Sequence, residues 1–176
     1  MEQETYTAFA GEQRLASGPL GVIAVAVKHA HADRVLIFSD RTGRETDVDT
    51  RGDEGEIMAR YAPPPPAKGR PKLGVVSREI TLLPRHWDWL SRQRGGASGT
   101  LRRLVDQAVS TTGERTRASA DAAYKFMSAI AGDLPGFEEA ARALFAADAD
   151  KFAAQTKDWP GDIRTHAHML AKDALV

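Results

Sequence analysis

Four consecutive prolines, at positions 63–66, constrain the fold of this 176-residue chain more than any other feature. Proline lacks a backbone N–H and has a fixed φ, so such a run cannot lie inside a helix or a central strand. It favours an extended polyproline helix instead. We interpret residues 61–72 (YAPPPPAKGRPK) as a stiff linker, although a proline-rich recognition ligand has the same composition. The linker separates a unit at 1–60 from the rest of the chain.

The first sixty residues predict two strands, a helix and two further strands. This ββαββ order indicates a small α+β unit. A unit of about 50 residues is near the lower limit of independent stability, so we expect it to pack on another part of the molecule. The strands are expected at 5–10, 12–16, 34–38 and 45–49, and the helix follows Gly18-Pro19.

The last sixty residues, 117–176, include 17 alanines and predict a helical unit. Glycine and proline mark two breaks in it, at 132–136 and 159–161. We expect this unit to contact an unknown protein or ligand. The helices are expected at about 118–131, 136–147, 148–156 and 161–174.

The whole chain is electrically balanced, with 24 Lys and Arg against 24 Asp and Glu. This balance excludes a uniformly basic coat protein for nucleic acid and an acidic disordered tail. The absence of cysteine excludes disulfide scaffolds, thiolate catalysis and zinc–thiolate sites. No apolar run is long enough to cross a bilayer, and the acidic N-terminus MEQETYTAF is unlike a signal peptide. We therefore expect a cytoplasmic protein with no membrane partner.

The balance hides a strong asymmetry. Residues 68–103 contain nine basic and two acidic side chains, a net charge of +7. The flanking segments, 1–67 and 104–176, carry −4 and −3. A segment this basic in a neutral chain is a candidate binding surface for a polyanion. The alternative is a solvated surface that pairs with the acidic flanks.

Residues 73–110 follow the order strand, helix, loop, helix. The β-branched, alternating run VVSREITLL at 75–83 predicts a strand, and Pro84 is suited to the first position of a helix. Gly95-Gly96 ends that helix, and Ser98 is expected to cap the next one. The second helix places apolar side chains on one face: Leu101, Leu104, Val105 and Ala108.

This segment resembles the ribbon-helix-helix superfamily of DNA-binding dimers. The resemblance rests on ITLLP at 80–84, Leu90, GGAS at 95–98, the L-x-x-L-V pattern from Leu101, and an upstream GRPK that is similar to a basic arm. It implies that residues 76–83 pair antiparallel with the same strand of a second copy, because a lone strand leaves its backbone groups unpaired. The two-stranded ribbon then fits the major groove of duplex DNA. We therefore expect a homodimer.

Alternation along the strand assigns Ile80 and Leu82 to the dimer core and Glu79 and Thr81 to the groove. The Thr81 hydroxyl can donate to and accept from base edges. The Glu79 carboxylate repels phosphates, and its one favourable base contact is a hydrogen bond from a cytosine amino group. A register shifted by one residue would turn Ile80 and Leu82 outward. Phosphate contacts are expected from Lys68, Arg70 and Lys72 in the arm and from Ser98, Arg102 and Arg103 in the second helix.

Other candidate sites are weaker. His166 and His168 lie near Asp162, but two residues on a helix separated by two positions point about 200° apart and cannot bind one ion together. We expect capping or surface roles for them. No glycine-rich phosphate loop occurs. We therefore expect no catalytic site, no metal and no cofactor, and we rank an enzyme in the helical unit as the third hypothesis.

Three long segments carry a second resemblance, over roughly residues 5–170. They are DRTGRETDVDTRG, the block SREITLLPRHWDWL with GGASGTLRRLV, and FMSAIAGDLPGFEEAARALFAADADKF. They resemble an uncharacterised bacterial family, known as a domain of unknown function. The resemblance implies no activity, only that the three regions belong together in one bacterial protein.

The leading hypothesis is a homodimeric DNA-binding protein that regulates transcription. The alternative is a protein-interaction adaptor that uses the same segment only to dimerise. Basic side chains that converge on the ribbon face would favour DNA, and basic side chains that pair with the acidic flanks would favour the adaptor.

Overall fold

The computed structural model describes residues 4–63, 76–109 and 112–176. The chain forms two compact units. Unit 1 combines residues 1–62 with residues 115–176, and unit 2 consists of residues 63–114. Most of the expected linker at 61–72 lies outside the described residues.

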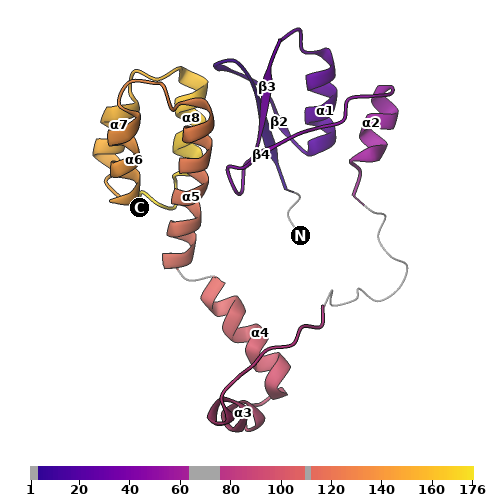
Figure 1. Ribbon diagram of the computed structural model, residues 1–176, viewed down its shortest axis with the longest axis vertical. Helices are drawn as coiled ribbons and strands as arrows, with labels where there is room; N and C mark the ends of the chain where they lie inside the picture. The colour runs from indigo at the N-terminus through magenta and orange to yellow at the C-terminus, as the bar shows by residue number, and fades with distance from the viewer. Residues whose placement is uncertain (1–3, 64–75, 110–111) are drawn as a thin grey trace. The chain divides into compact units, whose positions relative to one another are not determined.

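Unit 1 contains a four-stranded antiparallel sheet with the order β2-β1-β3-β4 (Figure 1). The predicted α+β class is confirmed, and so is the order of strands and helix in the first part of the chain. Alternation along β1 sends Phe9 to one face of the sheet and Ala8 to the other. The strands are β1 (Tyr6–Ala10), β2 (Gln13–Gly18), β3 (Val35–Ser39) and β4 (Glu45–Thr46).

Helices cover both faces of this sheet (Figure 1). On one face, α1 (Leu20–His29) packs Ile23 against Ala8 and Ile37. The helix α2 (Glu54–Arg60) packs in turn against α1. The other face packs against α5 (Thr112–Ile130) and α8 (Gly161–Leu170). The helices α6 (Phe137–Phe145) and α7 (Ala149–Thr156) pack on each other and add to the same core.

The main core of unit 1 joins the two ends of the chain. Phe9 and Phe38 of the sheet contact Phe126 of α5, with ring centroids 5.4 and 4.9 Å away. All three side chains are completely buried. The small α+β unit therefore does pack on another part of the molecule, as its size predicts, and its partner is the C-terminal helical segment.

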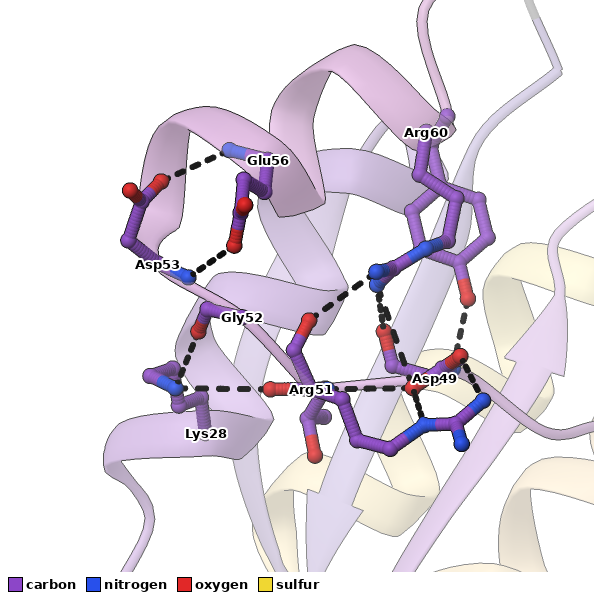
Figure 2. A network of polar contacts seen from close by, with 9 residues as sticks. Lys28, Asp49, Arg51, Gly52, Asp53, Glu56 and Arg60 are labelled. Carbon is purple, nitrogen blue, oxygen red and sulfur yellow. Dashed lines mark hydrogen bonds and ion pairs between the residues drawn. The ribbon is translucent and has the colours of Figure 1, made fainter.

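The expected strand at 45–49 is shorter than predicted, because β4 ends at Thr46. Side chains, rather than a neighbouring strand, bind the backbone carbonyls of the following loop (Figure 2). The Lys28 ammonium donates to the Gly52 carbonyl oxygen at 2.6 Å. The Arg60 guanidinium donates to the carbonyl oxygens of Asp49 and Arg51 at 2.9 and 3.0 Å.

The helix α2 was not among the expected elements, although its start has a recognisable signal. Asp53 accepts a hydrogen bond from the Glu56 backbone N–H, and the Glu56 carboxylate accepts one from the Asp53 N–H (Figure 2). This reciprocal arrangement is a capping box. The D-x-x-E spacing could therefore have predicted the helix.

Unit 2 contains two helices that pack on each other, α3 (Pro84–Ser91) and α4 (Gly96–Val109). Both were predicted, and Pro84 occupies the start of α3 as expected. The expected cap at Ser98 is wrong, because α4 already begins at Gly96. Gly95 and Gly96 both have positive φ, +97° and +71°, which allows the sharp turn just before the second helix.

Candidate nucleic-acid interface

Unit 2 buries very little of its apolar surface. Among its described residues only Leu90 and Thr100 are buried. Large apolar side chains remain exposed along the segment before α3 and on both helices. They are Val76, Ile80, Leu83, Trp87, Trp89, Leu104, Val105 and Val109.

The apolar side chains of α4 form one continuous stripe. They recur at i, i+3, i+4, i+7 and i+8 from Leu101, the spacing of a single helix face. Val105 is 58% exposed and Val109 is 62% exposed, so the C-terminal half of the stripe faces solvent in the single chain. This half of α4 therefore lacks a packing partner within the described part of unit 2, although α3 packs on the helix.

Arg103 lies on the opposite side of α4 from this stripe, Arg102 lies at its edge, and both are exposed. No described carboxylate of unit 2 forms an ion pair with any described arginine of that unit. The positive charge of the arginines is therefore not neutralised within unit 2. The four carboxylates concerned are Glu79, Asp88, Asp106 and Glu114.

The expected ribbon residues lie in an exposed, non-helical segment. Residues 76–83 form no strand within the single chain, and Glu79 and Thr81 are exposed. Ile80 is half exposed, and Leu82 is partly buried. Pairing between two copies of this segment therefore stays a prediction. The arm residues Lys68, Arg70 and Lys72 lie outside the part of the chain that the structure describes.

The first turn of α4, where residues 98–100 are expected to bind a phosphate, differs from the prediction. Because α4 begins at Gly96, its unpaired N–H groups belong to the turn that starts there. Ser98 is exposed in this first turn, next to those groups. The Thr100 side chain is buried, and its hydroxyl has no hydrogen-bond partner within the described structure. It is therefore not accessible to a phosphate.

The two C-terminal histidines point to different neighbours, as their spacing predicts. The His168 ring nitrogen lies 2.8 Å from the Thr156 hydroxyl. His166 is buried between the rings of Phe9 and Phe126, so the expected surface role is wrong for it. Burial lowers the pKa of His166 to about 4, against the opposing effect of the nearby Asp40 carboxylate. His166 is therefore neutral at pH 7.

Asp162, the third residue of that candidate cluster, has a structural partner. Its carboxylate accepts a hydrogen bond from the Arg14 backbone N–H at 2.8 Å. Arg14 belongs to β2, an edge strand of the sheet, and α8 packs on this strand. The contact satisfies an edge donor that would otherwise have no partner in the sheet.

The comparisons with known proteins place the chain in a family. A family model described as an uncharacterized protein conserved in bacteria (DUF2239) matches residues 5–171. The chain belongs to this family. The DUF2239 match spans unit 1 and unit 2 together, so α3 and α4 are part of the family's own sequence, and the predicted bacterial family is confirmed.

The DUF2239 family carries no described activity. The search of curated proteins gave no match, and the search of solved structures also gave none. Among the helices that the structure describes, none is long and apolar enough to cross a membrane.

Proposed function

We propose that this protein is a cytoplasmic homodimer that binds duplex DNA through residues 76–109 and regulates transcription. One observation carries the proposal: α4 has an exposed apolar stripe, with the exposed Arg102 at its edge and the exposed Arg103 opposite it, and neither arginine forms an ion pair with the described residues of unit 2. The stripe favours a packing partner, and the arginines offer positive charge to a polyanion.

A second copy of the chain suits the apolar stripe. Two copies of residues 76–83 would pair their unsatisfied backbone groups, and Ile80 would leave solvent in the same step. The stripe from Leu101 to Val109 would become buried between two α4 helices. The pairing of residues 76–83 and the burial of the α4 stripe both require the second copy, so one interface explains the unpaired segment and the exposed stripe.

Duplex DNA is a suitable partner for the basic side chains of unit 2. Arg102 and Arg103 are positioned to neutralise phosphates, and the first turn of α4 near Ser98 offers N–H groups to another. Glu79 and Thr81 lie on the segment that would face the bases. The arm residues Lys68, Arg70 and Lys72 would add phosphate contacts.

Dimerisation is tested by sedimentation of the full chain at micromolar concentration. The wild type should sediment as a dimer, and Val105→Glu should be monomeric because it buries a charge in the apolar stripe. Val22→Glu, at an exposed position of α1, is the matched control and should remain dimeric. A monomeric wild type would refute the proposed dimer.

DNA binding is tested by titrating duplexes at several salt concentrations. The affinity should fall steeply with salt, with a slope of about −0.9 for each neutralised phosphate. Replacing Arg102 and Arg103 by Ala should weaken binding to all sequences alike and reduce that slope. Lys157→Ala, an exposed lysine of unit 1, should change neither quantity.

Glu79→Gln separates two roles of the carboxylate. If Glu79 only repels the backbone, its replacement should strengthen binding to every duplex. If it accepts from a cytosine amino group, the replacement should relax discrimination at one base pair, by about 1–3 kcal/mol. Thr81→Ala should likewise alter sequence preference rather than overall affinity. The DNA proposal fails if neither the wild type nor Glu79→Gln binds any duplex at low salt.

The second candidate is a dimeric adaptor that recognises another protein. It is favoured by Trp87 and Trp89, which are 40% and 49% exposed on α3, because exposed tryptophans are typical of protein interfaces. The same experiments distinguish the two functions. A dimer that binds no duplex at any salt concentration would support the adaptor.

A further inference from the structure

Unit 1 contains a cavity of about 360 Å³ that no part of the proposed DNA-binding function uses. Three separate segments line it: the turn after β3, the first half of α5, and the end of α8 with the chain that follows it. Five of the lining side chains are charged. They are Asp40, Arg41, Arg115, Lys172 and Asp173.

Asp40 is the fixed polar group of this cavity. Its Oδ1 atom accepts a hydrogen bond from the Thr7 hydroxyl at 2.8 Å and lies 3.7 Å from the His166 Nε2 atom. Its side chain is 16% exposed, whereas the side chain of His166 is 3% exposed. The Oδ2 atom has no partner in the described structure, so Asp40 offers one free acceptor oxygen where it lines the cavity.

His166 gives a second, independent sign of a built site. Its Nε2 atom is buried, has no hydrogen-bond partner in the described part of the chain, and faces the Asp40 carboxylate. A buried polar atom without a partner is costly, and it is seldom retained without a role. The hydrogen bond from Thr7 holds the Asp40 carboxylate, and the His166 ring lies beside it.

The cations of the cavity are available to a ligand. Arg115 and Lys172 are exposed and form no ion pair with the residues that the structure describes. Arg41 already pairs with Glu4, at 3.2 Å. The lining thus combines two cations that form no ion pair with a described residue and one acceptor held by a hydrogen bond, and this set matches a molecule that has an anionic end and a donor end.

We propose that this cavity binds a small organic phosphate with hydroxyl groups, the phosphate on Arg115 and Lys172 and a hydroxyl donating to Asp40. The volume lies within the range of small-molecule pockets and suits a ligand of the size of a pentose phosphate. The apolar side chains of Met169 and Leu170 line the same cavity and would contact the carbon skeleton.

Isothermal titration of the full chain tests this assignment, with ribose 5-phosphate, ribose, inorganic phosphate and glycine as probes. Ribose 5-phosphate should bind most tightly, inorganic phosphate weakly, and ribose not measurably, because the charged contacts are the stronger ones. Arg115→Gln and Lys172→Gln should each weaken ribose 5-phosphate binding about ten-fold. Lys157→Gln, outside this cavity lining, should leave it unchanged.

Asp40→Asn tests the donor end separately from the anionic end. The amide oxygen can still accept from Thr7, so the fold should be retained, and circular dichroism checks this. Ribose 5-phosphate affinity should then fall towards that of inorganic phosphate, whose own affinity should not fall. If glycine binds more tightly than ribose 5-phosphate, the organic phosphate is the wrong ligand class. If no probe binds at millimolar concentration, or if Arg115→Gln and Lys172→Gln have no effect, the proposal is refuted.

Discussion

The two units solve the problem of burying apolar surface in different ways. Unit 1 places Phe9, Phe38 and Phe126 in contact and excludes all three from solvent. Unit 2 has a regular apolar stripe on α4 and leaves Val105 and Val109 more than half exposed. A sheet between two helical layers completes its core within one chain. A pair of helices with an unpaired extended segment does not, and this difference is what points to a second copy.

Truncation of one side chain in each unit should give the largest contrast. Phe126→Ala removes the centre of the unit 1 core and should cost about 4 kcal/mol of unfolding free energy. Its effect should be the same at any protein concentration. Leu104→Ala should cost less, and its effect should depend on concentration because it acts through association.

Urea denaturation at two protein concentrations, ten-fold or so apart, measures both effects. The comparison between the units breaks down if the cost of Leu104→Ala is independent of concentration. It also breaks down if Phe126→Ala costs no more than an ordinary surface substitution.

The second contrast uses pH and concerns unit 1 only. The pKa of His166 is lowered to about 4 in the folded protein, first by burial, whereas an unfolded histidine titrates near 6.5. The unfolded chain therefore binds a proton before the folded chain does. Stability is fully present above pH 6.5 and falls as the pH drops towards 4, by about 3 kcal/mol from this group.

Replacing His166 by Phe, which fits between Phe9 and Phe126, should remove this part of the pH dependence. His31→Phe, at an exposed position, should leave the pH dependence of stability unchanged. Denaturation curves at pH 7 and at about pH 4.5 measure the difference. An unchanged pH dependence in His166→Phe would show that other groups control acid stability.

The smallest contrast replaces one glycine in each unit by alanine. Gly43 and Gly95 both have positive φ, +63° and +97°, so alanine is strained at either position. At Gly43 a Cβ atom would also lie 1.9 Å from the Ala122 carbonyl oxygen of α5, whereas at Gly95 it would meet no atom within 4 Å. We expect a cost of about 2 kcal/mol at Gly43 and about 1 kcal/mol at Gly95.

Thermal melts of the two variants test this expectation. Equal losses would mean that the close approach of the β3–β4 turn to α5 relaxes without cost. A larger loss at Gly95 would reverse the comparison between the units.

Local patterns in the sequence predicted most elements of the fold. The tight turn after residues 5–10 identified β1, the continuous apolar run at 34–38 identified β3, and Pro84 identified the start of α3. The end of β4 was missed because the loop after it is held by Lys28 and Arg60, and these long-range contacts leave no local signal.

The candidate sites differ in how far they could be predicted. The exposed arginines on α4 follow from helical periodicity, which places Arg102 at the edge of the apolar stripe and Arg103 opposite it. The cavity around Asp40 could not be found in this way. Its lining joins Asp40, Arg115 and Lys172, which are far apart in the sequence and meet only through the fold.

The contact between Phe9 and Phe126 has a consequence for synthesis on the ribosome. More than one hundred residues separate the two rings, and the whole of unit 2 is translated between them. Translation proceeds at about 5–20 residues per second, so the sheet face with Phe9 and Phe38 stays uncovered for on the order of ten seconds before its helices are made. Translation products that stop within unit 2 keep this face uncovered, and we expect them to aggregate.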